Sequence, residues 1–169
     1  MVNVNKKIRN ATVVKSNKIT FKSMLEKMCY NTLLEQGFSP QYEPKQITLW
    51  GGFTPITPYY DEESKNHLLK RREQGDKTPR KLVQKNSKII GIRYPCDFYI
   101  KYGDLDIWIE AKSIENDVFY IKKKMFLKYL DNLYNTTGQK SMYFEVHSKK
   151  QLLQMIEIVK EYGKISSKE

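Results

Sequence analysis

The sequence predicts an α/β fold in which a central mixed β-sheet is flanked by helices. Three observations support this prediction. The chain has 169 residues, the length of one domain, and 40% of them are hydrophobic, which is enough for a core. Segments with helical spacing also alternate with segments of strand character, and that alternation is typical of helices packed on a sheet.

The first part of the chain begins with a basic arm at residues 1–19. A helix is predicted at residues 23–36, because apolar side chains recur there at helical spacing. Gly37 favours the end of this helix. Residues 42–50 have the character of a strand, which would be the first strand of the sheet.

Residues 51–88 differ in composition from the rest of the chain. They contain two adjacent glycines, three prolines and a run of basic residues from Lys70 onward. Glycine and proline mark turns and loops, and long loops are commonly functional. We therefore expect an insertion or long loop on a compact fold, with a short helix at residues 64–73.

The centre of the chain is predicted to be rich in strands. Strands are expected at residues 88–94, 97–102 and 105–113. Gly103 and Asp104 separate the last two strands and predict a tight turn. These two strands therefore form an antiparallel hairpin.

Two helices and one strand complete the pattern. Residues 118–134 and 149–162 each place apolar side chains on one helical face, and residues 140–146 form a strand between them. The tail from Gly163 is expected to fray.

The formal net charge of +11 indicates a partner of opposite charge. Such an excess attracts polyanions, of which nucleic acid is the most common. Cys29 and Cys96 have no other cysteine or histidine close in sequence, which indicates neither a zinc ribbon nor a disulfide scaffold. No stretch approaches the roughly 20 apolar residues of a membrane span, and the polar N-terminus is unlike a secretory signal.

The residues suited to chemistry lie in the predicted hairpin. Side chains alternate along a strand, so Glu110 and Lys112 point the same way. If the turn lies at Gly103 and Asp104, Asp97 falls opposite Glu110 and the two carboxylates share a face. The sequence therefore predicts two carboxylates and an ammonium group together on one pair of strands.

Two carboxylates on rigid strands form a hard oxygen site that suits Mg²⁺. The ion polarises a phosphoryl oxygen and lowers the pKa of a bound water. Lys112 would orient or deprotonate the attacking water and offset negative charge in the transition state. The carbonyl of Ala111 is a candidate for a further ligand, and Glu26 is the candidate for a third carboxylate.

Asp97, followed by Glu110-Ala111-Lys112 and preceded by a helical Glu26, resembles the motif of the PD-(D/E)xK nuclease superfamily. Pro95 lies two residues before Asp97, which is similar to a variant of the Pro-Asp pair of that superfamily. The twelve residues between Asp97 and Glu110 are similar in number to the gap in archaeal-type Holliday junction resolvases.

The start of the chain carries a second part of the resemblance. Phe21, Ser23 and Glu26, then Gly37 and Tyr42-Glu43-Pro44, are laid out in a way that resembles small phage-encoded endonucleases. The resemblance covers residues 19–50 and 89–126, and the stretch 51–88 departs from the compact pattern of the family.

The resemblance implies a restriction-endonuclease-like core and Mg²⁺-dependent hydrolysis of phosphodiester bonds in DNA, with Mn²⁺ as a substitute. It implies that Asp97 and Glu110 bind the metal, that Lys112 is the catalytic lysine, and that Glu26 binds metal or positions water. The expected setting is the cytoplasm of a bacterial or phage-infected cell, in recombination, replication or repair.

A chain of this length leaves no room for a separate target-recognition domain. We therefore expect selection of DNA by shape, such as a junction, a flap or a branch. Symmetrical cutting of a four-way junction requires two active sites related by a two-fold axis, and hence a homodimer.

Basic residues in two segments are candidates for contact with DNA, although a run of charges can also be only a solvated face. They are Lys70, Arg71, Arg72, Arg80 and Lys81 in the segment 51–88, and Lys122, Lys124 and Lys128 in the helix 118–134.

The candidate site residues also have structural interpretations. Glu110 and Lys112 would form an exposed ion pair, and Asp97 would only start its strand. Ser23 and Glu26 have the spacing of a capping box, in which the glutamate reaches back to the helix start. Two other function classes therefore stay open. One is a non-catalytic nucleic-acid-binding protein on a nuclease-like fold, and the other is a protein whose basic surface meets an acidic partner.

Overall fold

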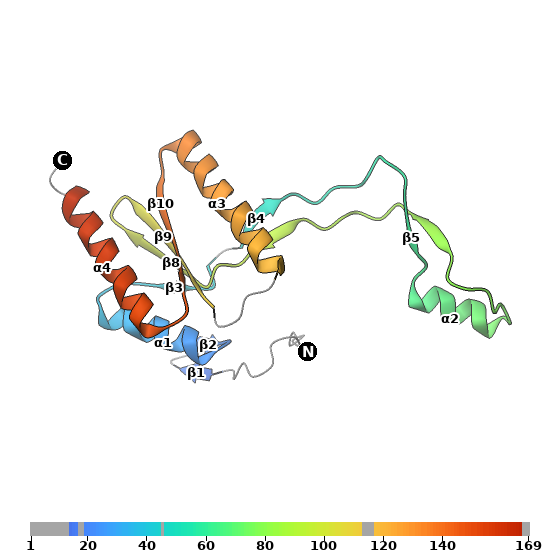
Figure 1. Cartoon of the computed structure of the whole chain (residues 1–169), viewed down its shortest axis with the longest axis horizontal. Coiled ribbons are helices and arrows are strands. Elements are labelled where there is room, and N and C mark those ends of the chain that lie inside the picture. Colours follow the sequence, from blue (N-terminus) through green and yellow to red (C-terminus); the bar gives the residue numbers. More distant parts are fainter. Residues whose placement is uncertain (1–13, 17–18, 45, 113–116, 167–169) are drawn as a thin grey trace. The chain divides into compact units, whose positions relative to one another are not determined.

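The computed structural model describes residues 14–16, 19–44, 46–112 and 117–166. Within these ranges the chain is mixed α/β, as predicted, with a mixed multi-strand sheet and four helices (Figure 1). The helices are α1 (Met24–Glu35), α2 (Lys65–Glu73), α3 (Asp117–Thr137) and α4 (Lys149–Ser166). The strands are β1 (Val14–Ser16), β2 (Ile19–Phe21), β3 (Gln41–Tyr42), β4 (Ile47–Trp50), β5 (Tyr59–Glu62), β6 (Leu82–Lys85), β7 (Ile92–Tyr94), β8 (Phe98–Tyr102), β9 (Leu105–Ala111) and β10 (Lys140–Val146).

The chain divides into two compact units. Unit 1 comprises Met1–Leu49 and Arg93–Glu169, and unit 2 comprises Trp50–Ile92. Unit 1 holds the main sheet and three of the described helices, while unit 2 holds α2 with the strand pair β5 and β6. The segment expected as an insertion or long loop therefore contains regular structure of its own.

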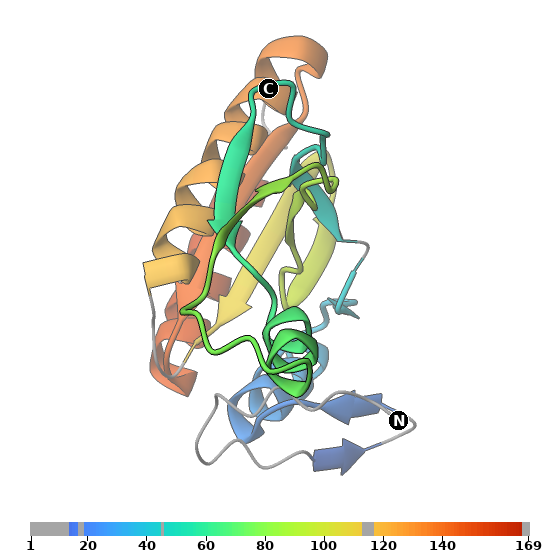
Figure 2. The same cartoon turned by 90° about the vertical axis from the view of Figure 1, so that its right-hand side faces the viewer.

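The main sheet of unit 1 has the strand order β10-β9-β8-β3. Strands β8 and β9 form the predicted antiparallel hairpin, whose turn places Gly103 at a φ of +61°. Strand β10 lies parallel to β9, and α3 makes the crossover between them. Figures 1 and 2 show α3 along one face of this sheet.

Each face of the sheet carries its own apolar cluster. On one face Leu105, Ile107 and Ile109 pack with side chains from α1 and α4. On the other face Trp108 packs with Phe126 and its neighbours in α3. The predicted period-two alternation of β9 is therefore confirmed, since successive side chains enter different clusters.

The helix predicted at residues 23–36 is confirmed as α1. It begins after Ser23, whose hydroxyl accepts a hydrogen bond from the backbone N–H of Glu26. Gly37, at a φ of +83°, follows its end, where a positive φ suits glycine. The helices predicted at residues 118–134 and 149–162 and the strand at 140–146 are also observed, with α3 and α4 extending a few residues further.

The single strand predicted at residues 42–50 is wrong. The chain forms two short strands, β3 and β4, because Glu43 adopts a φ of +47° and Pro44 follows it. The strand predicted at residues 88–94 is likewise shorter, since only Ile92–Tyr94 form β7 and Ile89 makes an isolated bridge to Phe53. A positive φ on a residue other than glycine gives no signal in hydrophobic periodicity.

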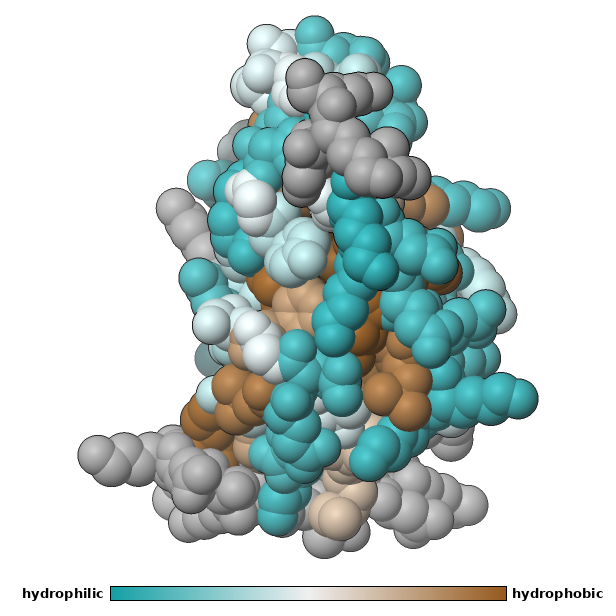
Figure 3. Space-filling view, turned by 90° about the vertical axis from the view of Figure 1, so that its left-hand side faces the viewer, coloured by the Kyte–Doolittle hydropathy of each residue, from teal (hydrophilic) through white to brown (hydrophobic). Residues whose placement is uncertain are grey.

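The exposed surface of the described residues is mixed. Figure 3 shows one face, on which hydrophobic residues form separate patches among polar ones. Scattered exposure of this kind is normal for a folded domain. No helix in the described part of the chain is long and apolar enough to cross a membrane.

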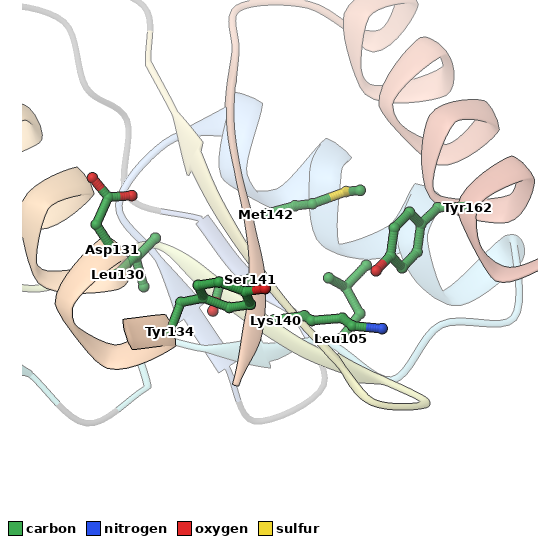
Figure 4. Close-up of a pocket in the computed structure, with 8 residues that line it drawn as sticks. All are labelled: Leu105, Leu130, Asp131, Tyr134, Lys140, Ser141, Met142 and Tyr162. Atoms are coloured by element: carbon green, nitrogen blue, oxygen red, sulfur yellow. The ribbon is translucent and has the colours of Figure 1, made fainter. Parts of the chain in front are cut away.

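A cavity of about 360 Å³ opens beside the first residues of β10 (Figure 4). Tyr134 of α3 and Tyr162 of α4 line it, together with Lys140 and Ser141 of β10. The cavity lies where β10 pairs with Leu105, at the beginning of β9, whereas Glu110 stands near the end of β9. Five residues of strand span about 16 Å, so the cavity and the acidic residues are separate features.

Unit 2 is held together by polar contacts. All of Trp50–Ile92 is described, and within it no apolar side chain is buried, whereas the carboxylate of Glu63 is. Arg71 donates to both oxygens of Glu63, to Asp76 at 2.5 Å, to Thr78 at 2.7 Å and to the carbonyl of Pro79 at 3.2 Å. These bonds use all five N–H groups of the guanidinium.

The ion cluster of Glu63, Arg71 and Asp76 is therefore the centre of unit 2. Hydrogen bonds from Arg71 lower the pKa of Glu63 to about 2, so this carboxylate is charged at every physiological pH. A buried charge is tolerated only when it is paired.

We expect Arg71→Ala to loosen unit 2 while unit 1 stays folded. Removing the guanidinium leaves the charge of Glu63 buried without its main partner. Hydrogen–deuterium exchange across Tyr59–Lys85 should then rise roughly ten-fold or more, with unchanged exchange in β8, β9 and β10. Arg72→Ala, at the exposed neighbouring residue, is the matched control and should leave exchange unchanged. Equal exchange in the two variants would contradict the role given to Arg71.

Candidate functional site

The β8–β9 register brings Asp97 and Glu110 together. Phe98 pairs with Ile109, so Asp97, the residue before β8, comes opposite Glu110 as the sequence predicted. One oxygen of Asp97 accepts a hydrogen bond from the backbone N–H of Ala111 at 2.9 Å. This bond fixes the Asp97 carboxylate against the end of β9.

Glu110 lies on the same face of β9 as Lys112 and is 5% exposed. Its Oε1 lies 3.4 Å from the Nζ of Lys112, and its Oε2 accepts a hydrogen bond from the hydroxyl of Tyr94 at 3.0 Å. The two donors lie on opposite oxygens of the carboxylate. Glu110 is therefore buried and Lys112 half-buried, unlike the exposed ion pair considered above.

The carboxylates of Asp97, which is half-buried, and Glu110, which is buried, disfavour each other's ionisation. Burial raises the pKa of Asp97 well above its usual range, and the negative charges of Glu110 and Glu26 raise it further. Burial also raises the pKa of Glu110, although Lys112 and the bond from Tyr94 offset part of that effect. A cation placed between such groups would relieve both the repulsion and the cost of burial.

Glu26 is buried and is occupied by bonds within unit 1. Its Oε1 accepts a hydrogen bond from the hydroxyl of Ser23 at 3.0 Å, and its Oε2 accepts one from the backbone N–H of Lys22 at 3.0 Å. The hydroxyl of Tyr42 also donates to Oε2. Ser23 therefore caps α1 as the capping-box interpretation expects, while the carboxylate of Glu26 reaches back to the N–H of Lys22, one residue before the cap. A metal-binding role for Glu26 stays a prediction.

The donor set fits a divalent cation only in part. Among the described residues, no group of three or more His, Cys, Asp and Glu side chains is gathered to hold a metal ion. Asp97 and Glu110 offer carboxylate oxygens, which Mg²⁺ prefers, and Mg²⁺ commonly takes one or two carboxylates and completes its shell with waters. Two carboxylates that repel each other are compatible with that mode of binding.

Glu145 is an acidic neighbour of the site that sequence reasoning missed. Strand β10 places it directly beside Glu110 in the parallel register, and its charge adds to the raised pKa of Glu110. Glu145 forms an ion pair with Lys123 at 2.5 Å and lies 3.3 Å from the ring nitrogen of His147. Alternation within residues 140–146 could have indicated its face, but the register with β9 is a non-local property.

Two lysines near the site were missed as well. Lys123 of α3 lies near the ring of Phe119, at 6.0 Å from its centre, and Lys112 lies over the same ring at 4.6 Å. Lys22 forms an ion pair with Glu43. Partial burial lowers the pKa of Lys22, but Glu43 and the nearby Asp97 raise it by more. The acidic pair is thus flanked by ammonium groups from more than one element.

The residues predicted to contact DNA lie in both units. On α3, Lys124 and Lys128 are exposed and Lys122 is half-buried. In unit 2, Lys70 and Arg72 are exposed in the last turn of α2. The other three are engaged in ion pairs: Arg71 with Glu63 and Asp76, Arg80 with Glu62, and Lys81 with Asp76.

No protein-family model, no curated protein and no solved structure matches this chain. The function therefore has to be inferred from the geometry of the site itself.

We expect Asp97→Asn to stabilise the protein when divalent metal is absent. The pKa of Asp97 is raised in the folded state, so its ionisation destabilises the fold once the pH exceeds the unfolded-state pKa, near 4. In EDTA at pH 7.5 the melting temperature should rise by about 2–4 °C, and this gain should disappear below about pH 4.

The control for this substitution is Asp104→Asn. Lys140 lowers the pKa of Asp104, so its ionised form is favoured and the amide should bring no gain. A melting temperature that stays the same or falls in Asp97→Asn would show that the fold accommodates the Asp97 charge without cost.

Proposed function

We propose that the protein is a Mg²⁺-dependent endonuclease that hydrolyses phosphodiester bonds in DNA on a restriction-endonuclease-like core. The observation that carries the proposal is the group formed by Asp97, Glu110 and Lys112. The buried carboxylate of Glu110, the half-buried carboxylate of Asp97 and an ammonium group meet at the same end of a strand pair, in a protein of net charge +11. A mixed sheet with helices on both faces is the architecture that the family resemblance implies.

In this mechanism Asp97 and Glu110 would hold the metal ion, with the carbonyl of Ala111 as a candidate third ligand. The ion would polarise the phosphoryl oxygen and acidify a bound water. Lys112 orients the attacking water or takes its proton, and its charge offsets the charge that develops on the phosphate. The oxygen of water forms a bond to phosphorus as the bond to the leaving oxygen breaks, and the leaving oxygen takes up a proton.

The basic surface supports binding to DNA through phosphates. Unit 2 contains nine basic and five acidic residues, and α3 adds four lysines in its first twelve residues. Because Arg71 is saturated by contacts inside unit 2, Lys70 and Arg72 are the better candidates there for contact with DNA. We propose that such contacts select DNA by shape, at a junction, flap or branch, and that a four-way junction is cut by a homodimer.

A second candidate function is binding of nucleic acid without catalysis. It is favoured by the hydrogen bonds that occupy the carboxylate of Glu26 at the start of α1. Of the three predicted metal ligands with carboxylates, only Asp97 and Glu110 then remain, and no group of three metal-holding side chains is found among the described residues. A protein of this kind would bind DNA in a salt-dependent manner and cut nothing.

A cleavage assay separates the two candidates. Labelled duplex, single-stranded, flap and four-way-junction DNA would be incubated with Mg²⁺, Mn²⁺ or EDTA. We expect cutting with either metal and none in EDTA. Glu110→Gln and Lys112→Ala should each lower the rate by roughly 10²–10⁴-fold, because each removes a group that acts on the transition state.

The matched controls are Glu157→Gln and Lys150→Ala, at exposed residues of α4. They should cut at the wild-type rate. Salt-dependent binding with no cutting under any metal would overturn the nuclease and leave the binding protein, whereas cutting that survives Glu110→Gln would place the active site elsewhere.

Binding to DNA in EDTA tests the role of unit 2. Each phosphate contact contributes about 0.9 to the slope of log K against log salt concentration, so the double variant Lys70→Ala/Arg72→Ala should lower that slope by about 2. Lys149→Ala/Lys150→Ala removes the same charge from α4 and should change the slope less. Equal changes in the two variants would show an effect of net charge alone.

A further inference from the structure

The two oxygens of the Glu110 carboxylate accept hydrogen bonds from two different kinds of donor, an ammonium group and a phenol hydroxyl. Lys112 approaches Oε1 at 3.4 Å, and the hydroxyl of Tyr94 donates to Oε2 at 3.0 Å. Tyr94 lies on β7, outside the motif that carries the family resemblance, and is 2% exposed. Because Tyr94 is so fully buried, its hydroxyl has little access to water and needs a partner inside the protein for its hydrogen bond. Glu110 is that partner.

A second tyrosine holds the first in place. The hydroxyl of Tyr143, on β10, lies 3.0 Å from that of Tyr94. An ionised carboxylate only accepts hydrogen bonds, so Tyr94 donates to Glu110 and Tyr143 donates to Tyr94. The chain of donors therefore runs in one direction, from Tyr143 through Tyr94 to Glu110.

Packing blocks other positions of the Tyr94 ring. The centre of the Phe126 ring lies 4.6 Å from the centre of the Tyr94 ring and 5.8 Å from the centre of the Tyr143 ring. Phe126 is itself completely buried in the cluster under α3. The Tyr94 hydroxyl is consequently a rigid donor whose direction is set by three elements of unit 1.

We propose that Tyr94, supported by Tyr143, is a positioning residue that fixes the Glu110 carboxylate in the orientation needed to hold a divalent cation. The inference rests on the proposed function, because it assigns a role to the donors behind the proposed metal ligand. Partners of this kind, which bind a ligand side chain from behind, commonly change metal affinity by 10–100-fold when they are removed.

The same strand provides an internal comparison. Asp106, on the same face of β9 as Glu110, accepts hydrogen bonds from Tyr99 at 2.8 Å and Lys101 at 2.9 Å. Asp106 thus has one tyrosine and one lysine as donors, as Glu110 does. It stands opposite Lys101 in the β8–β9 register, however, whereas Glu110 faces the carboxylate of Asp97. If tyrosines served only to satisfy acidic residues of the sheet, loss of either hydroxyl would have similar consequences.

The test compares Tyr94→Phe and Tyr143→Phe with the matched control Tyr99→Phe. Mn²⁺ would be titrated into the metal-free full chain and followed by electron paramagnetic resonance, with thermal unfolding measured alongside. We expect Tyr94→Phe to raise the Kd for Mn²⁺ by roughly 10–100-fold and Tyr143→Phe to raise it by a smaller factor. Tyr99→Phe should leave it unchanged.

The outcomes separate this inference from the function on which it rests. Wild-type affinity in a folded Tyr94→Phe variant overturns the positioning role, even if its melting temperature falls. If that variant does not fold, wild-type affinity in Tyr143→Phe overturns the inference instead. Absence of Mn²⁺ binding in the wild type, or binding unaffected by Glu110→Gln, overturns the proposed function itself and the inference with it.

Discussion

The hydrogen-bond register between β8 and β9 is the constraint on which the rest of unit 1 depends. It sends Ile107 and Ile109 into the core beneath α1 and α4, and it places Asp97 opposite Glu110. A slip of one residue would turn every side chain of β9 to the other face and drive Glu110 and Lys112 into that core. The core and the acidic pair are therefore specified together, since burial of one face of the hairpin fixes what the other face presents.

Ionisation of Asp97 and Glu110 destabilises the folded protein, and contacts from neighbouring residues offset only part of this destabilisation. The backbone N–H of Ala111 supports Asp97, while Tyr94 and Lys112 support Glu110. Even so, burial keeps the pKa of both carboxyl groups above the usual range. Sites that oppose stability in this way are typical of functional residues. A pair with a purely structural role would destabilise the fold less if it were more exposed or fully neutralised. Glu63 of unit 2 is neutralised in this way, because Arg71 donates to both of its oxygens.

Local patterns predicted much of unit 1, and non-local contacts explain what was missed. The helices α1, α3 and α4, the β8–β9 hairpin and the meeting of Asp97 with Glu110 follow from periodicity and a two-residue turn. The break at Glu43 arises from one backbone angle, which periodicity does not record. Tyr94 is only three residues from Asp97, but its bond to Glu110 is a contact of side chains that no periodicity records, and Glu145 reaches the site because β10 pairs with β9 from a distant part of the sequence. Knowledge of the strand order would have assigned Glu145 to the acidic pair, whereas Tyr94, on a strand outside that sheet, needed the packing itself.

The two units are stabilised by different physical means, and this difference bears on the role proposed for each. Unit 1 rests on two apolar clusters, which suit an acidic site that needs fixed side chains. Unit 2 rests on charges gathered at Arg71, and its apolar side chains are left exposed or half-buried. With little apolar surface withdrawn from water, its folding free energy has few sources besides these ion pairs and the bonds of one strand pair. Lys70 and Arg72 thus stand on a scaffold whose integrity is itself electrostatic, and because Arg71 spends its N–H groups on that scaffold, these two exposed side chains are the cations of the last turn of α2 that remain for a polyanion.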